Sequence, residues 1–161
     1  MSTDAAVPPF AEALGRVPSG LFIVTVRHEE QETGMLASWI MQAGFEPPAV
    51  TIAVRRDRYL ADWLSNGTPL VVNIIADNDK SLLKQFGKGF APGEPAFDGV
   101  EITRSPQNMA ILAAALGHLE CEVTGNLDTG DHRIVVAKVV GGRMAREGSP
   151  AVHVRKNGLR Y

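Results

Sequence analysis

The sequence predicts a mainly β domain, in which a β-barrel is decorated by a few short helices. Strand-like segments dominate both ends of the chain, and three of them precede any convincing helix. Such an order favours an antiparallel start over a βαβ repeat. The residues that follow Val26 are acidic and lack the glycine fingerprint of a doubly wound nucleotide-binding fold. The fold class is therefore predicted from strand order and from the absence of this motif.

Length and composition are those of one globular domain. The chain has 161 residues, 45% of them apolar, and a formal charge of −2, which excludes an extended nucleic-acid footprint. Its single cysteine, Cys121, has no intrachain partner, and four scattered histidines make no zinc site. No apolar run reaches the roughly 18 residues that span a bilayer, and the start lacks the features of a signal peptide. We expect a cytoplasmic protein that binds no metal, membrane or nucleic acid.

The first third of the chain predicts an arm followed by strands. Residues 1–14 are expected to form a flexible arm with a short helical turn near its end, because they are small, polar and proline-containing. Residues 21–27 are rich in β-branched side chains and predict a strand. A polar cluster then closes a hairpin into a second strand over residues 35–40, and residues 49–54 predict a third.

A proline joint separates the second and third predicted strands. The second predicted strand, with the residue just before it, contains the small residues Gly34, Ala37 and Ser38. Because their side chains take little space, a flat ligand or another backbone can approach the strand closely. Pro47 and Pro48 remove two backbone donors and fix two φ angles, which excludes a helix at this point. We interpret this unit as one wall of a cofactor site.

Two short helices are predicted in the middle of the chain. Asp57 is expected to cap the first, which ends at residues 66–67. Asp77 or Asp79 is expected to cap the second, which carries an apolar face and ends at Gly87.

The rest of the chain is predicted to be mostly strand. Residues 87–99 are rich in glycine and proline and predict a loop long enough to act as a lid. Residues 109–116 are compatible with a helix or a strand. Further strands are predicted over residues 70–75, 119–126 and 134–141, and within 151–161.

Two clusters near the proline joint are candidates for binding. Ala37-Ser38-Trp39 with Gln42 would offer backbone N–H groups and a hydroxyl to the rim of a planar ring; the alternative is an ordinary buried strand. Arg55-Arg56-Asp57-Arg58 stands before a predicted helix start, where free N–H groups and guanidinium forks suit a phosphate. The alternative is a solvated charged turn.

Two further clusters lie downstream. In Gly130-Asp131-His132, a histidine beside a carboxylate can position a substrate; the alternative is a polar hairpin tip. Lys84-Gln85-Phe86, followed by Lys88-Gly89-Phe90, would place cations near a phosphate and a ring over a ligand. Here a core face with solvated lysines is the alternative.

Taken in order, these motifs resemble the flavin reductase-like, FMN-binding split-barrel family, from about residue 15 onward. The resemblance rests on Gly-x-Leu-x-Ser-Trp (34–39), Pro-Pro (47–48), Val-x-x-Asp-Arg (54–58), Val-Val-Asn-Ile-Ile (71–75), Gln-Phe (85–86), Leu-Glu-Cys-x-Val (119–123) and Gly-Asp-His (130–132). Within the family, the chain is most similar to the C-terminal flavin reductase module of cyanobacterial flavodiiron proteins. That module also shares Phe-Ala-Pro-Gly (90–93) and His-x-Arg-Lys-x-Gly…Tyr (153–161).

The resemblance implies a fold, an assembly and an activity. Residues 15–161 would form a six-stranded antiparallel split β-barrel with a few short helices, paired in a homodimer with FMN at the subunit interface; FAD is also possible. The activity implied is NAD(P)H-dependent flavin reduction, in which hydride passes from the nicotinamide to flavin N5 and electrons pass on to a protein or free-flavin acceptor. A non-enzymatic FMN-binding electron-transfer module is one alternative, and a barrel that has lost its cofactor and serves as a scaffold is another.

The resemblance also assigns residues to the site. The isoalloxazine ring would be bound by Leu36, Ala37, Ser38, Trp39 and Gln42. The phosphate would be bound by Arg56, Asp57 and Arg58, and the ribityl chain or ring edge by Gln85 and Phe86. His132 would contact the nicotinamide, with Asp131 orienting it, as the catalytic pair.

Overall fold

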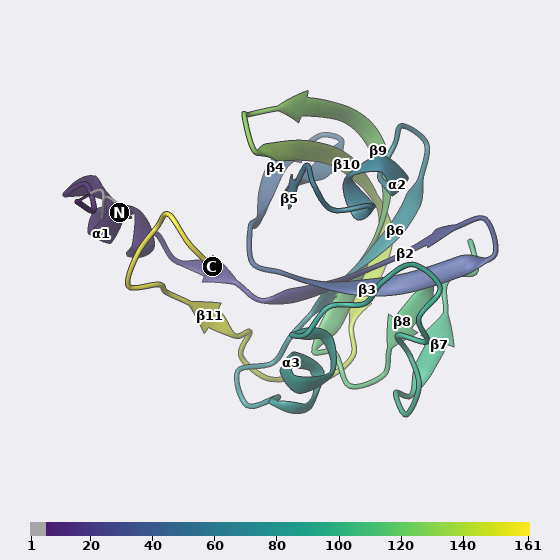
Figure 1. The fold of residues 1–161 in the computed structure, drawn as a ribbon. Coiled ribbons are helices and arrows are strands. Elements are labelled where there is room, and N and C mark those ends of the chain that lie inside the picture. The colour runs from purple at the N-terminus through teal and green to yellow at the C-terminus, as the bar shows by residue number, and fades with distance from the viewer. Residues whose placement is uncertain (1–5) are drawn as a thin grey trace.

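The computed structural model describes residues 6–161, which form strands and three short helices (Figure 1). The strands are β1 (Ser19–Gly20), β2 (Phe22–His28), β3 (Gln31–Ala37), β4 (Ile40–Phe45), β5 (Pro48–Arg55), β6 (Pro69–Ile74), β7 (Ile102–Arg104), β8 (Ala110–Leu112), β9 (Gly117–Asp128), β10 (His132–Met144) and β11 (Val152–His153). The helices are α1 (Phe10–Gly15), α2 (Leu60–Trp63) and α3 (Ser81–Phe86). None of these helices is long and apolar enough to cross a membrane. The predicted mainly β composition is confirmed.

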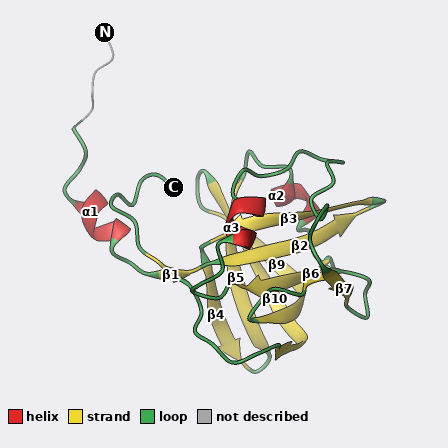
Figure 2. Cartoon of the chain, turned by 90° about the horizontal axis from the view of Figure 1, so that it is seen from below, coloured by secondary structure: helices red, strands yellow, loops and turns green. Residues whose placement is uncertain are grey.

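Seven strands form one antiparallel sheet in the order β3-β2-β6-β9-β10-β5-β4 (Figure 2). Its two edge strands, β3 and β4, are consecutive in the chain and are joined only by Ser38 and Trp39. Six spacings in a flat sheet would separate the edges by about 29 Å. Three Cα steps of chain reach only about 11 Å. The sheet must therefore curl until its edges come together at this connection.

Both faces of the curled sheet are covered, which is why β2 is buried almost throughout. Successive side chains point to opposite faces of a strand. Val24 and Val26 therefore join the cluster inside the curl, where Leu64 closes the end of α2, whereas Ile23 joins a second cluster with Phe86 of α3. The seven-stranded sheet thus has an apolar core on each side.

Gly34 allows α3 to approach the edge of the sheet. A Cβ atom at this position would lie 2.5 Å from Cε1 of Phe86, a distance that packed carbon atoms do not tolerate. The narrow part of β3 therefore admits a side chain of the same protein. Phe86 lies against β3 as a result, and this places the loop after α3 beside the strand.

The region around the proline joint differs from its prediction. The predicted strand over residues 35–40 is two strands, because β3 ends at Ala37 and β4 begins at Ile40. β4 was missed because its residues after Ile40 are polar, small or exposed and show no apolar alternation. Pro47 lies in the turn between β4 and β5, and Pro48 is the first residue of β5, so the predicted joint separates these two strands.

The predicted helix caps have different outcomes. Asp57 does not cap α2, which begins at Leu60 with no side-chain cap, so that prediction is wrong; the carboxylate is bonded to Arg55 instead. The N-cap residue of α3 is Lys80, so neither predicted aspartate occupies that position; Asp79, one residue earlier, still accepts the N–H groups of Ser81 (2.8 Å) and Leu82 (3.2 Å) through Oδ1. Within the open segment 109–116, residues 110–112 form the strand β8.

The two terminal segments are tied to each other. Residues 1–5 of the predicted arm lie outside the described residues, and α1 follows at Phe10. Backbone hydrogen bonds join Arg155 N to Gly15 O (2.9 Å) and Gly158 N to Ala11 O (2.7 Å), and β1 pairs with β11. In Figure 1 this unit projects from the side of the sheet. The segment after β11 is therefore anchored to α1.

Glu32 on β3 supports a prediction about stability against acid. Its carboxylate accepts hydrogen bonds from Arg104 of β7 (2.5 and 2.9 Å) and from Arg27 of β2 (3.4 Å). The pKa of Glu32 is lowered, mainly by the hydrogen bond from Arg104. Because its pKa is lower in the folded than in the unfolded protein, the pair contributes stability above the unfolded pKa and loses it as the pH falls through the folded pKa.

We expect Glu32→Gln to lower the free energy of unfolding by about 1 kcal/mol near pH 7 and to have little effect near pH 3. Urea denaturation at the two pH values measures this difference. Glu12→Gln is the matched control, because Glu12 pairs with Arg16 at 3.7 Å on an exposed helix face. Equal losses for Glu32→Gln at both pH values would contradict the assignment.

Candidate functional site

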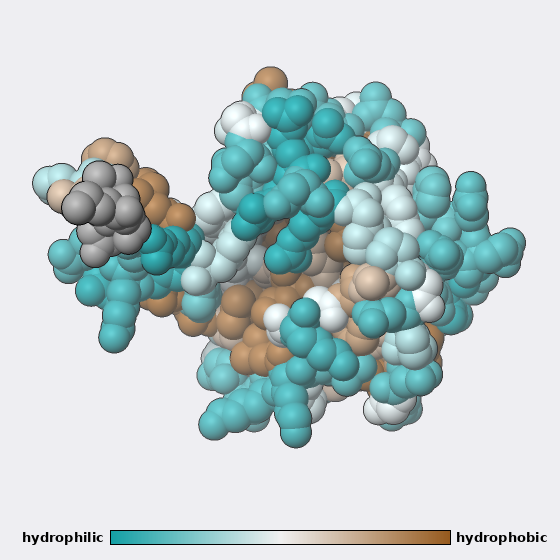
Figure 3. All heavy atoms as spheres, viewed as in Figure 1, coloured by the Kyte–Doolittle hydropathy of each residue, from teal (hydrophilic) through white to brown (hydrophobic). Residues whose placement is uncertain are grey.

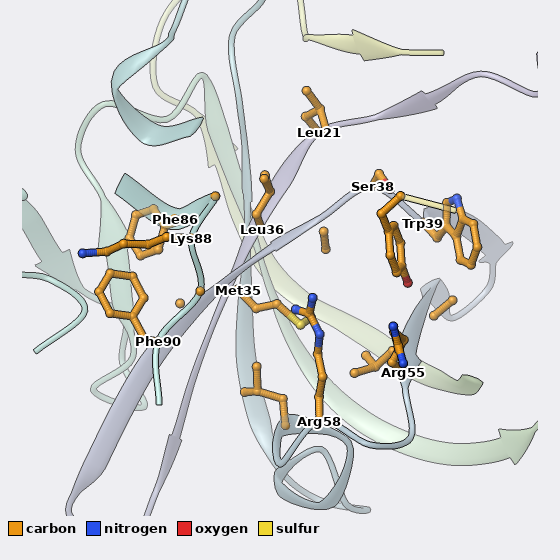
Figure 4. Close-up of a pocket in the computed structure, with 18 of the residues that line it drawn as sticks. Leu21, Met35, Leu36, Ser38, Trp39, Arg55, Arg58, Phe86, Lys88 and Phe90 are labelled. Carbon is orange, nitrogen blue, oxygen red and sulfur yellow. The ribbon is translucent and has the colours of Figure 1, made fainter. Parts of the chain in front are cut away.

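A cavity of about 730 Å³ opens where the edges of the curled sheet meet. Figure 3 shows a hollow with apolar side chains at its bottom and hydrophilic side chains around it, and Figure 4 shows residues that line the cavity. The lining comes from β3 and the connection that follows it, from the end of β5 and the turn before α2, and from the loop after α3. Leu21, His153 and Tyr161 complete it. Segments that are distant in the sequence therefore build one site.

One end of the cavity is apolar. Met35 and Leu36 of β3 line it together with Phe86 and Phe90, whose rings meet edge to face with centroids 5.8 Å apart. The ammonium group of Lys88 lies 5.2 Å from the centre of the Phe90 ring, which is within the range of a cation–π contact. This end suits a flat apolar ring and carries one cation at its rim.

The loop after α3 is fastened to the rest of the site. The hydroxyl of Tyr59 donates to the Phe90 carbonyl (2.8 Å) and lies 3.3 Å from Thr33 Oγ1. The Gln85 amide donates to the Ala96 carbonyl (3.0 Å). The predicted lid is therefore held at both ends by side-chain hydrogen bonds. Gln85 binds the loop and does not line the cavity.

The other end of the cavity is cationic. Arg55 and Arg58 line it, and the guanidinium of Arg55 makes two hydrogen bonds to Asp57 (2.6 and 3.1 Å). Arg58 has no side-chain hydrogen bond or ion pair within residues 6–161, and Figure 4 shows it inside the cavity. Arg56 turns away and donates to the Gly130 carbonyl (3.0 Å). A helix of one turn, such as α2, has almost no dipole to add, so Arg58 is the available anion partner.

His132 lies beside the cavity but behind its wall. The register of β10 and β5 pairs His132 with Arg55. The imidazole is only 11% exposed, with Nδ1 2.9 Å from Asp131 Oδ1 and Nε2 2.6 Å from Tyr161 Oη. Its ring centroid lies 4.9 Å from that of Trp39, which does line the cavity. Both ring nitrogens of His132 are therefore already bonded.

The structure brings half of the predicted site residues to the cavity. Those that line it are Leu36, Ala37, Ser38, Trp39, Arg58 and Phe86. Those that do not are Gln42, Arg56, Asp57, Gln85, Asp131 and His132. Among these, Gln42 lies exposed on β4, where its amide is 3.4 Å from the Gly44 carbonyl. The binding roles of both groups stay predictions.

Several lining residues were not identified from the sequence. They are Leu21, Met35, Tyr59, Glu94, His153 and Tyr161. Arg55, Lys88 and Phe90 also line the cavity and belong to clusters that the sequence singled out. For His153 and Tyr161 the only signal was the motif that runs from His153 to Tyr161. Nothing in the sequence marks Tyr59, because its role depends on a contact with a loop 31 residues away.

Comparison with known proteins gives consistent matches over most of the chain. A family model described as "Flavin reductase like domain" matches residues 14–158. Diflavin flavoprotein A 1 of Synechocystis sp. is 42% identical over 152 residues, which is 93% of this chain and 26% of that protein. The chain thus spans about a quarter of the length of this relative.

Solved structures with low sequence identity share the fold. The NADH:FAD oxidoreductase of Streptomyces globisporus aligns with a TM-score of 0.77 at 23% identity, over 89% of this chain and 80% of that one. The styrene monooxygenase flavin reductase of Pseudomonas putida aligns with a TM-score of 0.76 at 21% identity, over 91% and 93% of the two chains.

The hydroxyl of Tyr59 supports a prediction about the loop over the cavity. We expect Tyr59→Phe to speed amide hydrogen exchange in residues 87–94, because the substitution removes the donor that holds the Phe90 carbonyl. The global free energy of unfolding should fall by only about 1 kcal/mol, the usual net value of one hydrogen bond. Hydrogen-exchange mass spectrometry measures the loop directly.

Ser65→Ala is the control for this variant, because Ser65 follows α2 and bonds only to Thr68 (3.3 Å), away from the loop. Unchanged exchange in the Tyr59→Phe loop would show that other contacts hold it.

Proposed function

The chain belongs to the flavin reductase-like family, and we propose that it is an NAD(P)H-dependent flavin reductase that binds FMN in the cavity between β3, β5 and the loop after α3. The observation that carries the proposal is the pairing of apolar lining residues with an unbonded Arg58 in one cavity. A flavin mononucleotide has the same two parts, a flat ring system and a phosphate. Membership of the flavin reductase-like family supports flavin reduction as the class of reaction.

The residues present fit such a ligand. A volume of about 730 Å³ lies within the range of small-molecule sites. Ala37, Ser38 and Trp39 would border the ring, and Arg58 would bind the phosphate through its guanidinium fork. When bound, FMN supplies an acceptor for the hydride of a reduced nicotinamide. The protein's own residues then have to position two rings and exclude water.

The remaining predicted residues would support the site. Asp57 holds Arg55 at the cationic end, and Gln85 holds the loop. His132 and Asp131 would serve the nicotinamide side of the ring, because His132 lies next to Trp39. A hydrogen bond from the protein to the nicotinamide carboxamide would fix which face of the nicotinamide ring meets the flavin.

The assembly proposed for this function is a split-barrel homodimer with the flavin near the interface. On the edge strand β4, the apolar side chains of Met41 (62% exposed) and Phe45 (89% exposed) face outward. Exposed apolar side chains of this kind favour an interface with a second copy of the chain at this edge. The curled sheet, whose edges meet at Ser38 and Trp39, is compatible with such a barrel.

A second candidate function is a non-enzymatic FMN-binding module that carries electrons between proteins. One observation favours it, namely that both ring nitrogens of His132 are bonded and the imidazole does not line the cavity. A module without a nicotinamide substrate would not need that side chain free.

Visible absorbance of the purified protein separates these functions. A flavin reductase is expected to take up FMN and to lose flavin absorbance when NADH or NADPH is added without oxygen. Tight FMN binding without this loss would support the electron-transfer module. Failure to bind either FMN or FAD would refute both.

We expect Arg58→Ala to weaken FMN binding about tenfold, the value of one charge-assisted contact, and to leave riboflavin binding unchanged. Riboflavin lacks the phosphate, so the difference isolates the proposed contact. Titration monitored by flavin fluorescence measures both affinities. Arg56→Ala is the matched control, because the Arg56 guanidinium is bonded to Gly130 outside the cavity. Equal losses for FMN and riboflavin would exclude the phosphate role of Arg58.

We expect His132→Ala to raise the KM for the nicotinamide about tenfold while changing FMN affinity much less. Steady-state kinetics with NADH and NADPH, together with flavin titration, measure both quantities. Asp128→Asn serves as the control, because Asp128 lies in the same hairpin and binds Arg133 (2.8 Å) instead of His132. Turnover kinetics identical to the parent protein would count against any role of His132.

A further inference from the structure

Tyr161 is the member of a hydrogen-bonded chain that reaches the cavity. Asp131, which is 83% exposed, lies at the outer end, and His132 is in the middle with both ring nitrogens bonded. The Tyr161 hydroxyl bonds to Nε2 of His132, and the tyrosine lines the cavity. Its ring also lies 5.5 Å from the Trp39 ring, at an angle of 40°. The hydrogen-bonded chain therefore reaches the cavity through Tyr161.

The partners of this chain define its direction. The pKa of Asp131 is lowered, first by its hydrogen bond with His132, so the carboxylate is ionised and can only accept. The proton of a neutral imidazole then lies on Nδ1, which leaves Nε2 as an acceptor. Burial raises the pKa of the Tyr161 phenol, which keeps its proton and donates it to Nε2. The Tyr161 oxygen is left with lone pairs that can accept a further hydrogen bond.

The segment that carries Tyr161 is held in place independently of the cavity. Arg155 and Gly158 are bonded through their backbone N–H groups to α1. The guanidinium of Arg155 lies 4.8 Å from the centre of the Trp39 ring and donates to the Arg160 carbonyl (3.2 Å). These contacts deliver residue 161 to the cavity before any ligand is present.

We propose that Tyr161 is a substrate-contacting residue, whose hydroxyl accepts the carboxamide N–H of the nicotinamide, and that His132 and Asp131 are positioning residues that act through it. The inference rests on the proposed function and refines the place of His132 within it. A carboxamide is the chemistry that suits the site, because a flat amide can donate to Tyr161 while its ring lies beside Trp39. The chain of three groups then works as a unit.

A unit of this kind gives non-additive effects when its members are removed. We expect Tyr161→Phe to raise the KM for NADH or NADPH about tenfold, as much as His132→Ala, because it removes the proposed contact itself, and Tyr161→Ala to raise it at least as much. FMN affinity and kcat should change by less than about twofold. In His132→Ala/Tyr161→Phe, the KM should be no higher than in His132→Ala alone, because the second change removes a contact that is already lost.

Leu159→Ala is the matched control, because Leu159 lies on the same segment and is 53% exposed. It should leave all kinetic constants unchanged. In flavin-free protein, nitrogen NMR of the histidine rings gives a readout that does not depend on turnover. Tyr161→Phe should shift the Nε2 resonance of His132, whereas Leu159→Ala should not.

Each other outcome overturns the inference. A lower KM in Tyr161→Ala would make Tyr161 a plug that substrate displaces, and additive losses in the double variant would make it independent of His132. An unshifted Nε2 resonance in Tyr161→Phe would show that His132 and Tyr161 are not hydrogen-bonded. If the parent protein binds FMN but does not oxidise NADH or NADPH, the proposed reductase function fails, and the substrate contact fails with it. If the parent protein turns over normally and the KM is unchanged in both Tyr161 variants, only the proposed contact is refuted.

Discussion

The two-residue connection between β3 and β4 is the constraint on which the rest of the structure depends. It joins the two edges of a seven-stranded sheet, so the sheet has to curl until those edges meet. The curl encloses one apolar core, and the second core forms on the outside under α3. The cavity lies at the seam itself, since Ser38 and Trp39 are both in its wall. Fold and site therefore have the same geometric origin.

Small packing and charge choices then decide what the seam can bind. Gly34 lets Phe86 rest on β3, which brings the loop after α3 to the apolar end. At the other end, Asp57 neutralises Arg55 but not Arg58, so one guanidinium is available for an anion. A ligand that is flat at one end and anionic at the other fits this arrangement, which is why the geometry and the family point to the same class of cofactor.

The sequence predicted the central strands well, because β-branched runs such as residues 21–27 specify strands wherever they pack. It did not predict β4, whose exposed and small residues form a strand only through pairing with β5. The residues Ala37 to Trp39 and Arg58, which local motifs singled out, line the cavity, and their binding roles stay predictions. Tyr59 and Tyr161 were not assigned to the site because their positions depend on contacts with distant segments, which local patterns do not encode. Asp57 failed as a helix cap because a nearby arginine competed for its carboxylate.

The position of β3 at the edge of the sheet has a consequence for how the site can change over evolution. An edge strand leaves the N–H and C=O groups on one side without a neighbouring strand. Where that edge borders the cavity, a ligand can be recognised by main-chain atoms that every residue type except proline provides. Main-chain hydrogen bonds of this kind would not depend on which side chains β3 carries. Recognition at this edge would be robust to substitution, whereas the single guanidinium of Arg58 has no such substitute.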